Sequence, residues 1–299
     1  MTKALAPSGW AETGENLDRL LAELRPKLHR YCARMTGSVI DGEDVVQETL
    51  AKAFAASSSV GPIDNPERWL FRIAHNTALD FIRRRTRQQS GQIETELDML
   101  VDPTDVTTDR QLAAAGLRTF MQLPVSQRSS VILMDVLGYS LQEVGAVLET
   151  GIPAVKAALH RGRIRLRELA GEPEDLPVPV LTEPQRSLLA AYVERFNARD
   201  FDAIRDMLAD EVKLDLVART RMRGRAEVGT YLHNYADTFD WRLAPGWVEG
   251  RPAVLVRDPV NQASGPIYFV LLEWESQGLI NIRDFRYARY VGEAAEYSY

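Results

Sequence analysis

The sequence of 299 residues holds a single cysteine, Cys32, and only four histidines. One cysteine excludes an internal disulfide, and the histidines show no metal-ligand spacing with it, so we expect no metal, no cofactor and a reducing, cytoplasmic environment. No apolar run approaches the ~18 residues that a membrane span requires, and the N-terminus lacks the pattern of a secretory signal. The longest apolar run, residues 267–274, is typical of a strand.

The charge is unevenly distributed along the chain. The formal net charge is -6, yet residues 71–89 carry +4 and residues 156–167 carry +5, which leaves -15 on the remaining sequence. An acidic body with two concentrated basic patches suits a protein that touches a polyanion in two places. Two solvated helix faces are the alternative explanation.

Periodicity and composition divide the chain into seven segments. Two segments have helical periodicity, and a third combines helices at 185–199, 201–210 and 225–236 with strands around 240–257, 266–276 and 279–290. The predicted fold is therefore multidomain: an all-α helical bundle, an all-α helix-turn-helix and an α+β domain. The boundaries are a flexible N-terminus at 1–14, the bundle at 15–89, an acidic linker at 90–110, the helix-turn-helix at 111–170, a proline-rich linker at 171–183, the α+β domain at 184–292 and a tail at 293–299.

The helix expected over 65–87 has one apolar face and one cationic face. Arginines neutralise phosphates, and an aromatic beside them offers a stacking surface for an unpaired base, so this face favours opened or single-stranded nucleic acid. Asp80 is spaced to pair with Arg83 or Arg84. The alternative places the tryptophan in the core and the arginines on a solvated helix end. The residues that share the cationic arc are Trp69, Arg72, Asn76, Asp80, Arg83 and Arg87.

The segment 123–169 shows the spacing of a helix-turn-helix. Ser140 and Glu143 have the spacing of a capping box, and Pro153 is placed at the start of the last helix. That helix separates an apolar face from a cationic stripe, as a recognition helix in the major groove requires. A structural hairpin with a basic surface is the alternative. The stripe consists of Lys156, His160, Arg163 and Arg167, flanked by Arg161 and Arg165 for phosphate contacts.

Three blocks in this order resemble an extracytoplasmic-function (ECF) sigma factor of bacterial RNA polymerase: DGEDVVQETLAKAF at 41–54, NPERWLFRIAHNTALDFIRRR at 65–85, and residues 123–169. The resemblance implies that the first block docks on the clamp helices of the largest subunits of core polymerase through Asp41, Asp44, Gln47 and Glu48, with Phe54 on the packed face. It further implies that Trp69, Arg72, Asn76, Asp80, Arg83, Arg84, Arg85 and Arg87 hold the opened -10 promoter element. The helix at 153–167 would read the -35 element.

The segment 184–292 resembles the SnoaL-like fold, a cone-shaped unit of helices and a curved sheet. Folds of this kind enclose a pocket, but no spacing here identifies a catalytic pair, so we expect no enzymatic activity. By analogy with sigma factors that carry such tails, this domain and residues 175–179 would contact the sigma domains in cis and modulate their activity. The candidate pocket residues are Asp215, His233, Trp241, Trp247, Tyr268, Trp274 and Asp284.

Two other functions remain open from the sequence alone. One is a ligand-sensing DNA-binding regulator that acts without polymerase. The other is a SnoaL-like cyclase or hydrolase fused to DNA-binding helices. A sigma factor needs both an acidic docking helix and a strand-holding helix, and a plain regulator needs neither, so the segments at 41–54 and 65–87 favour the sigma factor.

Overall fold

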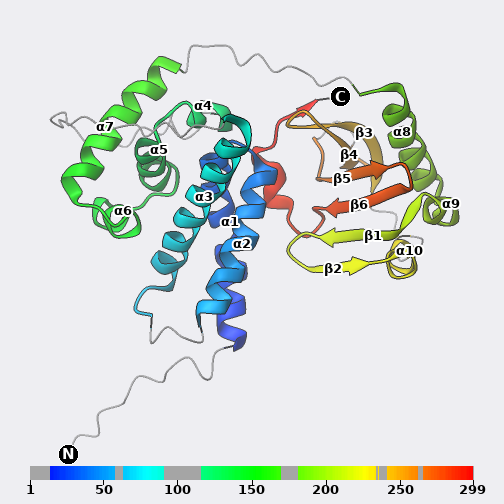
Figure 1. The fold of residues 1–299 in the computed structure, drawn as a ribbon, viewed down its shortest axis with the longest axis horizontal. Coiled ribbons are helices and arrows are strands. Elements are labelled where there is room, and N and C mark those ends of the chain that lie inside the picture. The colour runs from blue at the N-terminus through cyan, green and yellow to red at the C-terminus, as the bar shows by residue number, and fades with distance from the viewer. Residues whose placement is uncertain are drawn as a thin grey trace, which may run out of the picture. The chain divides into compact units, whose positions relative to one another are not determined.

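The computed structural model describes residues 14–57, 63–90, 116–169, 181–233, 235, 241–261 and 265–298. The chain forms two compact units, residues 1–173 and 174–299 (Figure 1). The expected flexible N-terminus up to residue 13, the acidic linker from residue 91 on, and residues 170–180 of the proline-rich linker lie outside the described residues. No described helix combines the length and apolarity of a membrane span.

Three long helices build the first half of the first unit (Figure 1). The side chain of Asn65 accepts a hydrogen bond from the backbone N–H of Arg68, and Pro66 occupies the first turn, so the third helix begins where the sequence predicts. The first helix ends at Thr36 and is followed by Gly37, whose φ of 75° is the left-handed conformation that glycine adopts readily. The helices are α1 (Gly14–Thr36), α2 (Val39–Ser57) and α3 (Pro66–Ser90).

The second half of the first unit is the expected helix-turn-helix. The capping box of Ser140 and Glu143 is present, with both reciprocal hydrogen bonds. The last helix passes close to an earlier one at Gly162, because a Cβ there would lie 2.8 Å from Cγ2 of Val131. The elements are α4 (Leu117–Met121), α5 (Val125–Val131), the π-helix η3 (Ile132–Val136), α6 (Leu141–Val147) and α7 (Ile152–Leu169).

One hydrophobic core joins the two halves. It contains Leu28 and Phe71 from the long helices together with Phe120 and Leu159 from the helix-turn-helix. The buried Arg128 of α5 donates to the backbone oxygen of Met35 at 2.7 Å, and also to those of Met121 and Leu123 at 3.0 and 2.9 Å. Its charge therefore lies at the negative end of the α1 dipole. The structure thus packs together two segments that the sequence divides by a linker.

The second unit is an α+β fold, as predicted. In the described part of the unit, a seven-stranded sheet has the order β2-β1-β6-β5-β4-β3-β7, in which β1 and β6 are parallel, and three helices lie against one face (Figure 1). The helices are α8 (Glu183–Ala198), α9 (Phe201–Asp206) and α10 (Arg225–His233). The strands are β1 (Leu208–Leu216), β2 (Thr220–Arg223), β3 (Arg242–Val248), β4 (Arg251–Arg257), β5 (Tyr268–Glu275), β6 (Gly278–Asp284) and β7 (Tyr297–Ser298).

Three details of this unit differ from the sequence expectations. Strand β1 begins at Leu208, inside the helix expected over 201–210. The strand-like run expected around 240–257 is divided into β3 and β4, which form a hairpin. Glu249 and Gly250 at its turn have φ of 49° and 74°, as a tight two-residue turn requires. Residues 297 and 298, expected in a tail, pair with β3 after the short helix η4 (Arg289–Ala294).

Candidate polymerase and nucleic-acid surfaces, and a tyrosine-lined cavity

Helix α2 presents the predicted docking residues at different depths. Asp44 is exposed, Gln47 and Glu48 are half-buried, and Asp41 is buried. Phe54 was expected on the packed face, but it is 65% exposed, so that expectation is wrong. An exposed aromatic on the same helix as the carboxylates is typical of a partner surface.

Helix α3 carries the predicted cationic face on its outside. Trp69 is half-buried against the core, whereas Arg72, Asn76, Asp80, Arg83, Arg84, Arg85 and Arg87 are exposed. The predicted pairing of Asp80 with Arg83 is confirmed at 3.6 Å, and Lys52 of α2 lies 3.9 Å from the same carboxylate.

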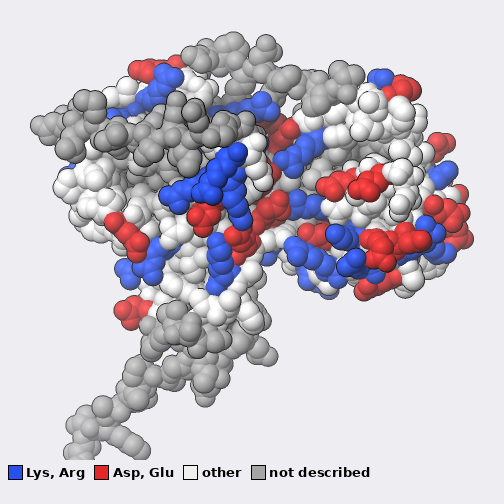
Figure 2. All heavy atoms as spheres, viewed as in Figure 1, with Lys and Arg blue, Asp and Glu red and all other residues white. Residues whose placement is uncertain are grey.

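Ion pairs connect the acidic edge of α2 to the cationic face of α3. Arg84 lies 2.8 Å from Glu48, and Arg85 lies 2.5 Å from Asp41. Burial raises the pKa of Glu48, but hydrogen bonds from Arg84 and Lys52 outweigh this and hold it below its usual value. Figure 2 shows Lys and Arg side chains beside Asp and Glu side chains over α2 and α3. The expected polymerase and DNA surfaces therefore adjoin and neutralise each other in part.

Helix α7 leaves the predicted stripe only partly accessible. Arg165 and Arg167 are exposed, and Lys156, His160 and Arg161 are half-buried. Arg165 makes an i,i+3 ion pair with Glu168 at 3.1 Å. The arrangement leaves long cationic side chains along the outer side of the second helix of the motif, as major-groove binding requires.

The prediction for Arg163 is wrong. Its side chain is 5% exposed, and Nε and Nη2 donate to the two carboxylate oxygens of Asp135 at 2.9 and 2.6 Å. Asp135 belongs to the π-helix η3, and its side chain is fully buried. This bidentate pair holds α7 against η3. Arg163 is therefore a packing residue of the motif.

Polar contacts close the seam between the two halves of the first unit. Glu67 of α3 lies 2.5 Å from Nζ of Lys27 and accepts a hydrogen bond from the hydroxyl of Tyr139 at 2.5 Å. The Lys27 ammonium also lies 4.3 Å from the centre of the Tyr139 ring. Further along the seam, Arg72 pairs with Glu149 at 3.2 Å. One predicted -10 residue is thus engaged by the helix-turn-helix half.

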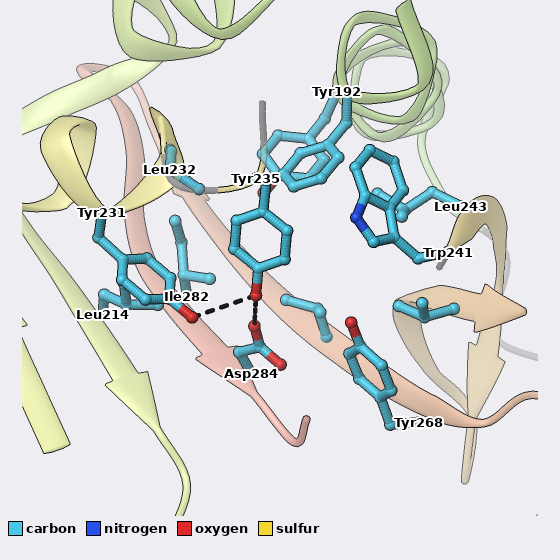
Figure 3. A pocket seen from close by; sticks show the side chains of 13 residues that line it. Tyr192, Leu214, Tyr231, Leu232, Tyr235, Trp241, Leu243, Tyr268, Ile282 and Asp284 are labelled. Carbon is cyan, nitrogen blue, oxygen red and sulfur yellow. Dashed lines mark hydrogen bonds between the residues drawn. The ribbon is translucent and has the colours of Figure 1, made fainter. Parts of the chain in front are cut away.

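The second unit contains a small cavity between the helices and the sheet (Figure 3). Trp241 and Tyr268 of the candidate pocket residues line it, together with Asp284. The hydroxyl of Tyr235 donates to Oδ2 of Asp284 at 3.0 Å and lies 3.1 Å from the hydroxyl of Tyr231. Leucine, valine and isoleucine side chains and further aromatic rings form the remaining wall.

Burial controls the protonation of this network. It raises the pKa of the Asp284 carboxyl, and hydrogen bonds from the Arg286 backbone and from Tyr235 offset this only in part. Burial likewise raises the pKa of Tyr231 to about 12. Tyr231 therefore keeps its hydroxyl hydrogen at neutral pH.

The other candidate pocket residues do not line the cavity. His233 is exposed, Trp247 is half-buried on β3, and Trp274 packs edge-on against Tyr192. Asp215 stands opposite Arg283 on neighbouring strands and lies 3.4 Å from Arg221. Among the described residues no group of three or more histidine, cysteine or acidic side chains is arranged to hold a metal.

Four aromatic residues of the cavity were not predicted from the sequence: Tyr192, Phe196, Tyr231 and Tyr235. The available signal was the spacing of Tyr231 and Tyr235, which are four residues apart. Residues at that spacing lie on one face of a helix.

Comparisons with known proteins match the helical segments and extend beyond them. Residues 20–88 match Sigma-70 region 2, and residues 117–166 match Sigma-70, region 4. The ECF RNA polymerase sigma factor SigG of Mycobacterium tuberculosis is 30% identical over 259 residues, covering 77% of this chain and 70% of that protein. This match is long enough to extend past residue 173 into the second unit.

Two further proteins are similar to the chain. ECF RNA polymerase sigma factor SigE of Mycolicibacterium smegmatis is 32% identical over 155 residues, covering 50% of this chain and 60% of that protein. The crystal structure of the extracytoplasmic function sigma factor SigJ of Mycobacterium tuberculosis covers 89% of this chain and 95% of that chain, with 18% identity and a TM-score of 0.35.

Proposed function

This chain belongs to the ECF RNA polymerase sigma factors, and on that premise we propose how its surfaces direct transcription. A sigma factor brings core RNA polymerase to promoters, so its partners are the core enzyme and promoter DNA, and the role needs no catalytic step. We assign the α2 carboxylates and Phe54 to the clamp helices of core polymerase, the outer face of α3 to the opened -10 strand, and the outer side of α7 to the -35 element. The acidic edge of α2 beside the cationic face of α3 is the observation that carries this assignment. A DNA-binding regulator that acts without polymerase does not need these α2 carboxylates.

The ion pairs between α2 and α3 couple DNA binding to polymerase docking. In the free chain Glu48 and Asp41 partly neutralise Arg84 and Arg85. When cations of the core enzyme engage these carboxylates, the two arginines become available for phosphates of the promoter strand. The free factor then binds DNA weakly, and the docked factor holds it.

The test uses Glu48→Gln in the full chain. Glu48 pairs with Lys52 as well as with Arg84, so the change releases both cations. It should strengthen binding of the unaccompanied chain to a single-stranded -10 oligonucleotide and steepen the salt dependence of log K by ~0.7 for each cation that reaches a phosphate. The same change should weaken binding to core polymerase. Glu23→Gln is the matched control, because Glu23 pairs with Arg19 on α1. Unchanged affinities for the oligonucleotide and for core polymerase would disprove the proposed coupling of DNA binding to polymerase docking.

The closed seam implies an opening step. The -10 and -35 elements, centred ~25 base pairs apart, are separated by ~85 Å of duplex at 3.4 Å per base pair. Helix α3, with its 25 residues, is only ~38 Å long, and its packed face belongs to the same core as α7. The first unit in this closed arrangement therefore cannot contact the -10 and -35 elements at the same time. We propose that the seam at Glu67, Tyr139 and Glu149 parts when polymerase and promoter bind.

The second unit is proposed to modulate this activity in cis by contacting the sigma domains. The similarity to SigG supports a place for this unit in a sigma factor, because the match continues beyond residue 173. Residues 175–179, expected to assist in this contact, lie outside the described residues. Run-off transcription should differ between the full chain and a chain ending at residue 173 at equal core affinity. Identical activity and core affinity would remove the proposal.

A further inference from the structure

The start of helix α7 exposes apolar side chains on the surface that we assign to the -35 element. Ile152 is 38% exposed at the first position of the helix, and Pro153 and Ala154 after it are exposed as well. Val155 and Leu159 of the same helix are buried in the core of the first unit. Single exposed apolar side chains are common on protein surfaces, but here three follow one another. Packing inside the first unit therefore leaves much of the Ile152 side chain free to contact a partner.

Ile152 lies where a recognition helix reads base pairs. In helix-turn-helix proteins the N-terminal residues of the second helix contact base edges in the major groove. Ile152, Lys156 and Arg163 lie within an arc of about 40° on α7, at 100° per residue. Arg163 is buried against Asp135, so only the first half of this side of the helix is accessible to DNA. The first two turns therefore present one apolar and one cationic side chain to the groove.

The chemistry of the first turn selects one feature of the major groove. The side chains of Ile152, Pro153 and Ala154 carry no hydrogen-bonding group. A donor or acceptor on a base edge opposite them would lose water without gaining a partner. Thymine presents a methyl group in the major groove, and cytosine, the other pyrimidine, lacks it. Isoleucine suits contact with a methyl group, because its branched side chain is stiff in a helix and loses little freedom on binding.

We propose that Ile152 is a specificity-determining residue of the -35 contact and packs against the C5-methyl group of a thymine. Lys156 and Arg161, which follow along α7, hold the helix in position on the duplex. This inference rests on the proposed assignment of α7 to the -35 element. It adds the base that the start of the helix recognises, which is thymine in preference to cytosine at one position of the element.

The experiment removes a single methyl group from the DNA. Holoenzyme, assembled from core polymerase and the full chain, first selects duplexes from a library randomised over the -35 region. Each thymine of the selected element, on either strand, is then replaced in turn by uracil, which differs by the C5-methyl group alone. At one thymine we expect uracil to weaken holoenzyme binding about three- to fourfold, as the loss of one buried methyl contact predicts. In holoenzyme with Ile152→Ala, the same replacement should leave binding almost unchanged, because the methyl group has lost its partner.

Ile164→Ala is the matched control. Ile164 is 42% exposed on the same helix, but it lies ~18 Å farther along the helix axis at 1.5 Å per residue. Its replacement should leave the uracil effect at about three- to fourfold. Both isoleucines are exposed, so the two variants should unfold at the same urea midpoint as the unaltered chain. The comparison of thymine with uracil in the unaltered holoenzyme needs no variant at all.

The possible outcomes separate this inference from the proposed function. A holoenzyme that selects no -35 sequence would contradict the assignment of α7 itself, and the inference with it. A selected element without thymine, or one in which no uracil replacement weakens binding, would overturn the thymine contact alone. A uracil effect that persists in Ile152→Ala, or disappears in Ile164→Ala, would show that another residue contacts the methyl group and would equally overturn it.

Discussion

Replacing Arg163 with methionine separates the stability of the helix-turn-helix from DNA recognition. The guanidinium and Asp135 are almost completely buried and joined by hydrogen bonds of 2.9 and 2.6 Å. Removing one partner leaves an uncompensated buried charge, which costs about 3–5 kcal/mol in comparable pairs. Replacing both partners by apolar side chains of similar volume is often neutral. Arg163→Met should therefore lower the free energy of unfolding of the first unit by that amount, and adding Asp135→Leu should restore most of it.

Urea denaturation of the full chain, followed by circular dichroism, measures these free energies, with the transition of the second unit as internal reference. Arg165→Met is the matched control on the same helix. Its ion pair with Glu168 is about half exposed, so its loss should change the free energy of unfolding by less than ~1 kcal/mol. The reasoning is refuted if Arg163→Met costs no more than Arg165→Met, or if Arg163→Met weakens promoter binding while the free energy of unfolding stays unchanged.

Four further changes test other parts of the structure. Gly162→Ala should destabilise the first unit by about 1–3 kcal/mol, because the new Cβ would lie 2.8 Å from a Val131 methyl; an unchanged urea midpoint would contradict this packing. Arg128→Met should cost at least about 3 kcal/mol in the same assay, since three backbone oxygens lose a charged donor; a loss below 1 kcal/mol would contradict it. Burial lowers the pKa of His75 on α3 to about 4, so the unfolded chain binds more protons than the folded chain below pH 6.5. The free energy of unfolding should therefore fall by about 2–3 kcal/mol between pH 6.5 and pH 4. His75→Gln should make the free energy of unfolding less dependent on pH in this range. Lys156→Ala should weaken binding to a duplex with the -35 element by about 1–3 kcal/mol while stability is retained; equal losses on unrelated duplexes would refute base recognition.

Local signals explain what could be predicted in the first unit. The start of α3 at Asn65 and the capping box at Ser140 depend on residues within one turn, and both appear as expected. The position of Arg163 depends on Asp135, which lies 28 residues away on a π-helix that no local pattern indicates. Phe54 is exposed because of how far the neighbouring helices extend along α2. The periodicity of the α2 sequence does not give that information.

The cavity shows a similar division. Leu214 and Leu216 alternate with Asp215 in the sequence. Because side chains alternate between the two faces of a strand, this pattern predicts that Asp215 lies on the outer side of β1. The inward position of Asp284 depends on the register of β6 against β1, where it stands beside Leu216. Tyr235, just after α10, reaches this carboxyl on β6 from 49 residues away in the sequence. Pairing of distant segments therefore decided which aspartate serves the cavity.

Run-off transcription with core RNA polymerase and a library of genomic promoter fragments tests the central claim most directly. The account predicts that adding the purified chain produces a small set of discrete transcripts. It also predicts that Arg84→Ala with Arg85→Ala abolishes them while core binding persists, because these arginines hold the opened strand. Core binding without specific initiation, or discrete transcripts that survive loss of both arginines, would contradict it.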